Sequence, residues 1–497
     1  MLRGTLLTIA GLAAGSALVP ASASADTLRE ALAQAYRTNP VLAGARAQQR
    51  GTDENVVIEK SRGRPSVDAT ADYIEFVKQA STSFTAPERS VGTGLDLGVP
   101  LYSGGAVKNA VRAAETRVAA GQAELRATES SLFSQVVAAY MNVIGQEAIV
   151  GLSANQVDVL AVNLDATGDR FEIGILTRTD VAQSASRLAL AQGDLQSARA
   201  NLISARENYI QLVGEAPTNL QPPPPLPGLP ATVGEAVLIA LESNPDLIAA
   251  IERAEAAGID IRVAGAGRLP RVSLFAGGNY NNFLGTLGGS GGGVAVNPPQ
   301  GQTSAQVGVR LSVPLLQGGL TAARERQASA FASAALEQVI AVERDVIGQV
   351  RSSWSSWQAA LAIIDSSQSA VDAAELSLEG VRAENTVGNR TVLDILDAEQ
   401  ELLGSRVQLV TARRNAYVAG FSLLAAMGRA EARDLGLFPG EQLYDPQTNY
   451  EAVRGKWWDW ERTEAPTTTG TSTVDIPAPD AEIPGEIQGP ELDRRPS

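Results

Sequence analysis

Two short segments of this 497-residue chain carry residues whose types and spacing suggest a charged site. Both follow the pattern Gly-x-x-Thr-x-x-Asp, one beginning at Gly174 and ending at Asp180, the other beginning at Gly388 and ending at Asp394. The pattern predicts a tight connection between two helices, since glycine accepts a left-handed backbone and a carboxylate is favoured at a helix N-terminus. Capping is a sufficient role for Asp180. Asp394 is followed three residues later by Asp397, so two carboxylates share one helix face, where they can attract cations.

The composition excludes most other kinds of catalytic and metal-binding site. The chain has no histidine and no cysteine, which excludes disulfides, thiol nucleophiles, Ser-His-Asp catalysis and zinc sites built on these residues. Carboxylate-pair, lysine-based and calcium or magnesium chemistry is not excluded. The formal charge of -15 argues against nucleic acid as a partner. We therefore predict a protein that is not an enzyme and has no cofactor and no resident metal.

The chain is a tandem duplication. TLREALAQAYRTNP from Thr27 is matched by TVGEAVLIALESNP from Thr232, and Asp180 is matched by Asp394. The two copies differ three residues after the aspartate of the turn, where the first copy has Gln183 and the second has Asp397. We assign residues 26–214 to the first repeat and 232–428 to the second, joined by the proline-rich linker 215–231.

Each copy contains two segments in which apolar and polar residues alternate. This alternation predicts strands near residues 66–76, 90–100, 271–283 and 303–314. A soluble two-faced sheet would show the same alternation. Their length of about ten residues, the glycines on the polar face and the aromatic residues at their ends favour a membrane barrel.

The sequences VPLYSGG and VPLLQGG end the second strand of each copy and precede a long helix. We predict strand-to-helix turns here, formed by Pro100, Gly104, Gly105, Pro314, Gly318 and Gly319. Apolar residues then recur every seven positions, which predicts coiled-coil packing. Outgoing helices of about 65 residues would be roughly 100 Å long. A plain coiled-coil rod would explain these helices but not the strands.

Four strands cannot close a membrane barrel, because the smallest barrels need about eight and lipid tolerates no open edge. Copies of the chain must therefore share one barrel. Two copies would supply eight strands and three would supply twelve, and the residues alone leave both numbers open.

The two ends of the chain carry different signals. Residues 1–25 combine Arg3, an apolar run and a small-residue cleavage site, which predicts a secretory signal peptide. Residues 429–460 are assigned to a C-terminal structural segment, although its tryptophans Trp457, Trp458 and Trp460 suggest no role. Residues 461–497 are rich in Pro, Thr and Glu, which predicts a disordered tail.

The order of these features resembles the TolC family of outer-membrane export channels over residues 26 to about 428. The resemblance rests on the doubled Gly-x-x-Thr-x-x-Asp turn and the doubled Pro-Leu-x-x-Gly-Gly. It implies an α+β membrane protein in which a homotrimer shares one twelve-stranded barrel, continued by a long α-helical tunnel across the periplasm. The linker and residues 429–460 would belong to a mixed equatorial domain.

The same resemblance assigns roles at the periplasmic mouth of the tunnel. Asp394 and Asp397 match the paired aspartates of the family, which would place six carboxylates around the threefold axis as a selectivity ring. Arg390 matches an arginine that reaches toward the first-copy turn, here Thr179 and Asp180. Where the best-known family member has a tyrosine in this gate network, the chain has Asn385.

The expected function is a passive conduit from the periplasm to the exterior, placed in the outer membrane. Its partners would be outer-membrane lipid, a periplasmic adaptor and an inner-membrane ABC or RND-type transporter. Type I protein secretion is the preferred system, with multidrug efflux as its rival. A periplasmic coiled-coil adaptor or a structural rod are alternatives of another class.

Overall fold

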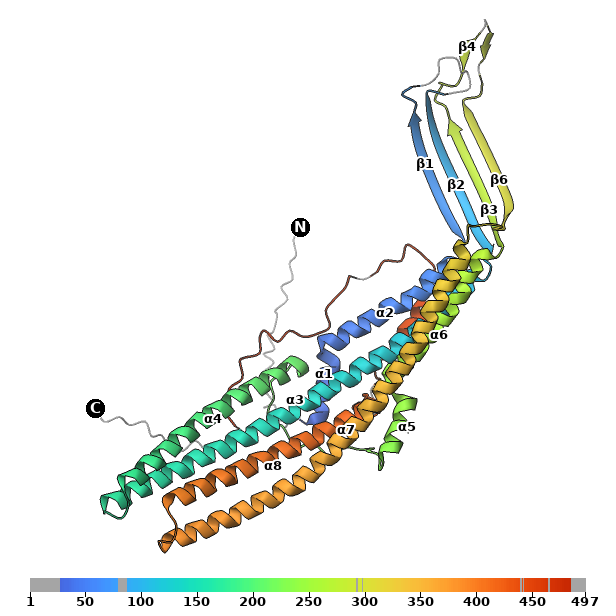
Figure 1. The fold of residues 1–497 in the computed structure, drawn as a ribbon. Coiled ribbons are helices and arrows are strands. Elements are labelled where there is room, and N and C mark those ends of the chain that lie inside the picture. The colour runs from blue at the N-terminus through green and yellow to red at the C-terminus, as the bar shows by residue number, and fades with distance from the viewer. Residues whose placement is uncertain are drawn as a thin grey trace, which may run out of the picture.

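The computed structural model describes residues 27–78, 87–291, 294–296, 298–438, 440, 442–463 and 465–483. The predicted signal peptide lies outside these residues. The molecule is elongated, with a four-stranded sheet at one end and two long helical hairpins extending away from it (Figure 1).

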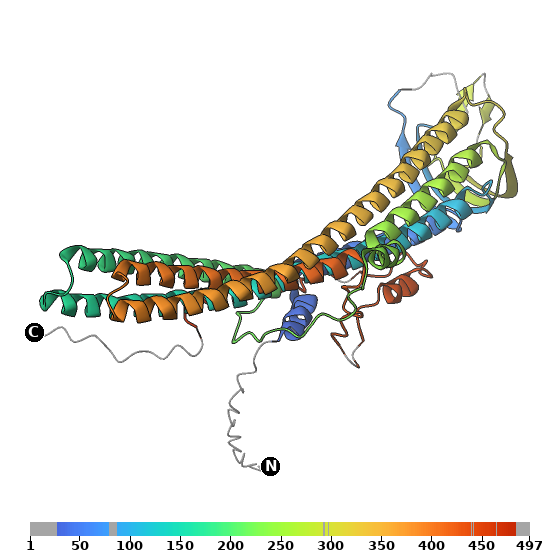
Figure 2. The same ribbon diagram turned by 60° about the horizontal axis from the view of Figure 1, so that its bottom comes forward.

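Each repeat contains one long helical hairpin. The first consists of α3 (Ala106–Glu172) and α4 (Arg178–Val213), and the second of α7 (Leu320–Thr386) and α8 (Val392–Ala426). Both outgoing helices have 67 residues, close to the predicted length, and each spans about 100 Å. Their turns lie at the same end of the molecule, far from the sheet (Figure 2). Heptad residues such as Val118, Leu125 and Leu132 of α3 are buried, as coiled-coil packing requires.

Shorter helices precede each hairpin. They are α1 (Leu28–Thr38) and α2 (Pro40–Ser61) in the first repeat, and α5 (Val233–Ser243), α6 (Pro245–Gly265) and the 3-10 turn η1 (Ala266–Arg268) in the second. Another short helix, α9 (Pro446–Val453), follows the second hairpin. Thr27 and Glu30 form a reciprocal capping box at α1. At α5 the box is altered, because the carboxylate of Glu235 accepts a hydrogen bond from the amide of Ala231 at 3.1 Å.

The sheet is antiparallel with the order β1-β2-β3-β6. Its strands are β1 (Ser66–Glu75), β2 (Arg89–Tyr102), β3 (Arg271–Asn282) and β6 (Gly301–Ser312). A small ribbon of β4 (Gly289–Gly291) and β5 (Val294–Val296) lies beyond the outer end of β3 and β6. In the part of the chain that the structure describes, the outer edges of β1 and β6 pair with no other strand.

The strand register sorts side chains into apolar and polar rows. One row across the four strands is Val67, Leu97, Ala276 and Val307, and the next is Asp68, Asp96, Gly277 and Gln306. Adjacent residues of a strand point to opposite faces, so these rows give the sheet one apolar and one polar face. Glycines on the polar face leave room for neighbouring side chains. A Cβ added at Gly308 would lie 2.8 Å from Cζ of Phe275.

The strand-to-helix turns have the predicted glycines in the left-handed region. Gly104 and Gly105 have φ of 65° and 79°. Gly318 and Gly319 have φ of 56° and 81°. Pro100 lies inside β2, where the register to β3 shifts between Pro100 and Tyr102, as expected of a residue without an N–H to donate. Pro314 follows the end of β6.

The largest apolar core lies midway along the bundle. Phe133, Tyr140 and Tyr209 are buried there together with Phe421. The proline-rich linker crosses this region as irregular chain, held where Tyr140 donates a hydrogen bond to the carbonyl of Gln221 at 2.6 Å. Among the described helices, α3 alone is long and apolar enough to cross a membrane, with a mean hydropathy of 1.3, but half of that window is buried in the bundle.

Part of the segment that follows residue 461 contacts the helical bundle. Residues 480–483 lie against α4, where the buried Arg206 donates hydrogen bonds to the carbonyls of Asp480 and Glu482, both at 2.8 Å. Arg206 also pairs with Glu147 at 2.8 Å, and Ile483 packs against the central core. Composition alone could not indicate this partner, because Arg206 lies more than 250 residues away in the chain.

Candidate functional site at the hairpin turns

The second turn joins α7 to α8 and holds the predicted acidic pair. Gly388 has φ of 82°, which reverses the chain after α7. Thr391 then caps α8, and its backbone N–H and hydroxyl donate to Asp394 Oδ2 at 2.8 and 2.7 Å. These hydrogen bonds hold the pKa of Asp394 below its usual value, so the carboxylate stays ionised.

The first turn repeats this geometry. Gly174 has φ of 81°, and Thr177 caps α4. The N–H and hydroxyl of Thr177 donate to Asp180 Oδ2 at 2.8 and 2.7 Å, which lowers the pKa of Asp180. Thr177 and Thr391 are the threonines of the two Gly-x-x-Thr-x-x-Asp motifs, so the motif itself contains the capping residue.

Arg390 is engaged within its own turn. Its Nε donates to Glu384 Oε2 at 2.8 Å, and a guanidinium nitrogen lies 3.8 Å from Asp394 Oδ1. The hydrogen bond to Glu384 and the two carboxylate charges raise the pKa of Arg390. Among the described contacts, none joins Arg390 to Thr179 or Asp180. That longer link stays a prediction.

Asn385 connects the two repeats near the hairpin turns. Its amide nitrogen donates to the carbonyl of Arg390 at 2.8 Å, which stabilises the second turn. Its amide oxygen accepts a hydrogen bond from Arg170, at the end of α3, at 3.4 Å. Asn385, which the resemblance aligns with a tyrosine of the best-known family member, therefore joins one hairpin to the other.

Asp397 forms a second connection between the hairpins. A guanidinium nitrogen of Arg187 on α4 lies 2.5 Å from Asp397 Oδ1 on α8. Two residues further along α8, Glu399 is buried and paired with Arg382 of α7. Arg187, Arg382, Arg170 and Glu384 were not predicted, because a pairing across helices leaves no local pattern in the sequence.

Apolar packing fixes the position of these charges. Leu396 and Val392 of α8 are buried against Leu160 of α3 and Ala191 of α4. Leu396 lies between Asp394 and Asp397 in the chain, and its burial fixes this part of α8 while both carboxylates stay partly exposed.

The arrangement suits electrostatic attraction of cations rather than tight metal binding. The carboxylates of Asp394 and Asp397 are both exposed beyond a third of their surface. Within the described residues, no group of three or more acidic side chains could hold a metal ion. Each carboxylate also has an arginine neighbour in the same chain, which weakens its field.

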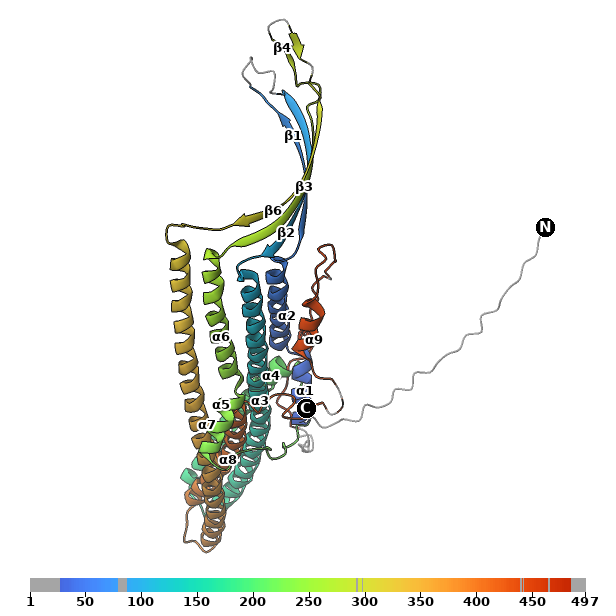
Figure 3. The ribbon, with the colours of Figure 1, turned by 90° about the vertical axis from the view of Figure 1, so that its right-hand side faces the viewer.

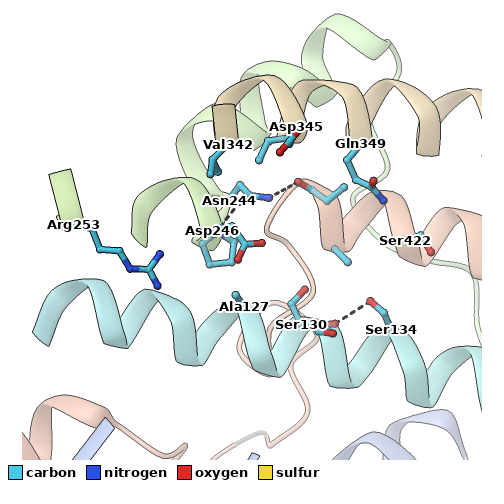
Figure 4. Close-up of a pocket in the computed structure, with 15 residues that line it drawn as sticks. Ala127, Ser130, Ser134, Asn244, Asp246, Arg253, Val342, Asp345, Gln349 and Ser422 are labelled. Carbon is cyan, nitrogen blue, oxygen red and sulfur yellow. Dashed lines mark hydrogen bonds between the residues drawn. The ribbon is translucent and has the colours of Figure 1, made fainter. Parts of the chain in front are cut away.

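A hollow away from the two turns lies between the hairpins in the middle of the bundle. It measures about 630 Å³ and is lined by residues that include Ser130, Asp246, Arg253, Asp345 and Gln349 (Figure 4). Some of its polar groups already have structural roles, because Asn244 caps α6 and donates to the carbonyl of Ala426 at 2.9 Å. Burial raises the pKa of Asp246.

Comparison with known proteins gives a match in both repeats. The family model described as outer membrane efflux protein matches residues 31–215 and 237–429. The matched ranges include the four strands of the sheet, both hairpins and both turns.

Three similar proteins illustrate the range of the match. The outer membrane efflux protein BepC of Brucella suis is 35% identical over 91% of this chain and 96% of its own length. The alkaline protease secretion protein AprF of Pseudomonas aeruginosa is 28% identical over 63% of this chain and 64% of its own length. The crystal structure of the outer membrane protein VceC of Vibrio cholerae superposes with a TM-score of 0.68 at 24% identity, covering 81% of this chain and 96% of that one. The predicted fold class is thereby confirmed.

Proposed function

Because this chain belongs to the outer membrane efflux protein family, we propose that it is the passive outer-membrane conduit of a tripartite export system. In this proposal it receives cargo from an inner-membrane transporter through a periplasmic adaptor. Its place is the outer membrane, with the helical hairpins extending into the periplasm.

The observation that carries the proposal is the open sheet. Four strands with one apolar face end in two free edges, at β1 and β6. Lipid requires every backbone group to be paired, so β6 of one copy must pair with β1 of the next. Three copies close a barrel of twelve strands, which is wide enough for a lumen lined by the polar face.

The helices support the same assembly. α7 leaves large apolar side chains uncovered along its length, among them Phe331, Leu336 and Leu376, the last with 71% of its surface exposed. Apolar surface of this extent indicates an interaction partner. A neighbouring copy around the same axis would cover it and complete a tunnel of twelve long helices.

At the mouth of this tunnel, Asp394 and Asp397 would form the selectivity ring. Threefold symmetry brings six carboxylates to one constriction, and a ring of carboxylates favours cations. The contacts of Asn385 with Arg170 and of Asp397 with Arg187 join the hairpins at this level, so we assign them to the closed gate.

The cargo has two candidates. Small-molecule efflux is supported by the 35% identity to a protein named as an efflux protein over nearly the whole chain. Type I protein secretion, preferred from the sequence, is supported by the similarity to a protein named for protease secretion. It stays a prediction.

Conductance across a planar bilayer tests the conduit. The purified trimer should give cation-selective channels that divalent cations block. Replacing Asp394 and Asp397 with asparagine should raise the conductance and abolish the block. Asp180→Asn is the matched control, since it removes the same capping carboxylate from the repeat that has Gln183. A protein that never conducts would overturn the proposal.

Deletion of the gene tests the cargo. Loss of resistance to toxic compounds with unchanged secreted proteins would assign efflux. The reverse result would assign type I secretion.

A further inference from the structure

Three exposed tryptophans have no role in the conduit described above. Trp457, Trp458 and Trp460 have 69%, 64% and 84% of their surfaces exposed. They follow α9, and the rings of Trp457 and Trp458 contact each other edge-on with centroids 6.4 Å apart. The chain has five tryptophans, so most of them lie in this one segment, which we call the tryptophan segment (residues 454–462).

α9 is fixed along α2, which sets where the tryptophan segment can lie. The amide of Asn449 on α9 donates to the carboxylate of Asp53 at 2.7 Å, and Asp53 is fully buried. Gln49 donates to the other oxygen of the same carboxylate at 2.9 Å. Tyr450 packs against the apolar cluster around Val56. The two helices are therefore joined by polar and apolar contacts.

The tryptophan segment then reaches the end of α2 nearest the sheet. Lys60 donates to the carbonyl of Arg454 at 3.4 Å, and Arg64 donates to the carbonyl of Lys456 at 2.5 Å. Arg64 lies two residues before β1 begins at Ser66. Figure 3 shows the chain beyond α9 rising to the level at which the strands leave the helices. The segment thus lies at the periplasmic rim of the barrel.

The residues at this rim suit a lipid-water interface. Indole rings prefer the headgroup level of a bilayer, because they are largely apolar and carry one N–H donor. Arginine and lysine place their charges among lipid phosphates while their stems stay in apolar surroundings. Lys60, Arg62 and Arg64 precede β1 at the same rim, where Arg62 pairs with Glu59 at 2.9 Å and Lys60 lies 3.8 Å from Glu115.

The strands alone supply aromatic residues unevenly. Tyr73 and Tyr280 lie near the outer end of the sheet, and both are exposed. Near the inner end, Tyr102 is exposed at the close of β2. A membrane barrel carries aromatic residues at both of its interfaces. The tryptophan segment lies at the inner end of the sheet, where the strands supply few aromatic residues for the periplasmic interface.

We propose that the tryptophan segment inserts Trp457, Trp458 and Trp460 into the headgroup region of the periplasmic phospholipid leaflet and completes the inner aromatic girdle of the barrel. Most of the inner aromatic residues are then provided by chain that follows the second repeat rather than by the strands. This inference rests on the outer-membrane location and is independent of the exported cargo.

Tryptophan fluorescence in brominated bilayers tests the proposal. Two variants of the full chain are compared as trimers in vesicles of zwitterionic and anionic phospholipid. Trp354→Phe with Trp357→Phe leaves emission from the tryptophan segment alone. The matched control replaces Trp457, Trp458 and Trp460 with phenylalanine, which leaves emission from α7 alone. Both must assemble as trimers and conduct ions, so a folding defect is recognised separately.

Bromine on the acyl carbons nearest the headgroup should lower the emission of the first variant by roughly half, since the rings would lie within that layer. The control should keep its emission, because Trp354 and Trp357 lie in the middle of the bundle. Quenching of the first variant by aqueous iodide but not by bromolipid would place the rings in the periplasm and overturn the proposal. Emission insensitive to both quenchers would place them against a neighbouring subunit and overturn it equally.

Discussion

Opening of the mouth should depend on the pair formed by Arg187 and Asp397. The pair links α4 of the first hairpin to α8 of the second, with a nitrogen-oxygen distance of 2.5 Å. If the hairpins separate when the channel opens, this contact is lost in each of three subunits. The perturbation is therefore the removal of one partner at a time, by Arg187→Gln or by Asp397→Asn.

The size of the effect follows from the exposure of the pair. The two side chains have 34% and 57% of their surfaces exposed, which places them among solvent-screened pairs. Such a pair contributes about 0.6 kcal/mol, so three copies contribute about 2 kcal/mol. Loss of this energy from the closed state raises the ratio of open to closed channels about 30-fold.

The assay is the open probability of single channels in planar bilayers at low salt. Both variants should raise it, while cation selectivity should rise with Arg187→Gln and fall with Asp397→Asn. The double variant should open no more than either single variant, because the shared contact is already lost. High salt should reduce the difference from the unmodified protein.

The reasoning is refuted if the two single variants move the open probability in opposite directions. That outcome would mean that the net charge of the mouth governs opening and the contact between hairpins does not. Asp180→Asn again serves as the control, since Asp180 forms a capping box without a partner on the other hairpin among the described ion pairs.

Three further predictions concern other parts of the molecule. Burial raises the pKa of Glu129 to about 7, so its ionisation destabilises the fold as pH rises from about 4.5 to 7. The melting temperature of Glu129→Gln, measured against pH, should therefore change less across this range than that of the unmodified protein. Arg206→Ala should free residues 465–483, seen as faster limited proteolysis of the C-terminal segment with an unchanged trimer. Gly388→Ala should lower the stability of its turn by about 1 kcal/mol, because alanine is strained at the φ of 82° even though its Cβ would meet no neighbouring atom. Amide hydrogen exchange should become faster at this turn and stay unchanged at the Gly174 turn.

Much of this fold was predictable because the determinants are local and repeated. Period-two alternation predicted strands, and the observed rows of Val67 and Asp68 agree with one apolar and one polar face. Seven-residue periodicity predicted coiled-coil packing in helices of this length. The motif around Gly388 predicted a helix-to-helix turn, and the structure has one there.

The side-chain partners at the mouth were not predictable in the same way. Arg187 and Asp397 lie 210 residues apart, and either could face solvent without violating any local preference. Arg390 illustrates the reverse case, because its nearest carboxylates belong to its own turn rather than to the first-copy turn expected from the resemblance. Polar partners depend on how the repeats pack, which periodicity does not specify.

The duplicated hairpin has a consequence for how such a channel can vary. An alteration in one codon is reproduced three times around the axis, and a matched alteration in both copies would be reproduced six times. The formal charge of the entrance can therefore change only in multiples of three. The difference between Gln183 and Asp397 is the smallest such increment, three negative charges in a trimer.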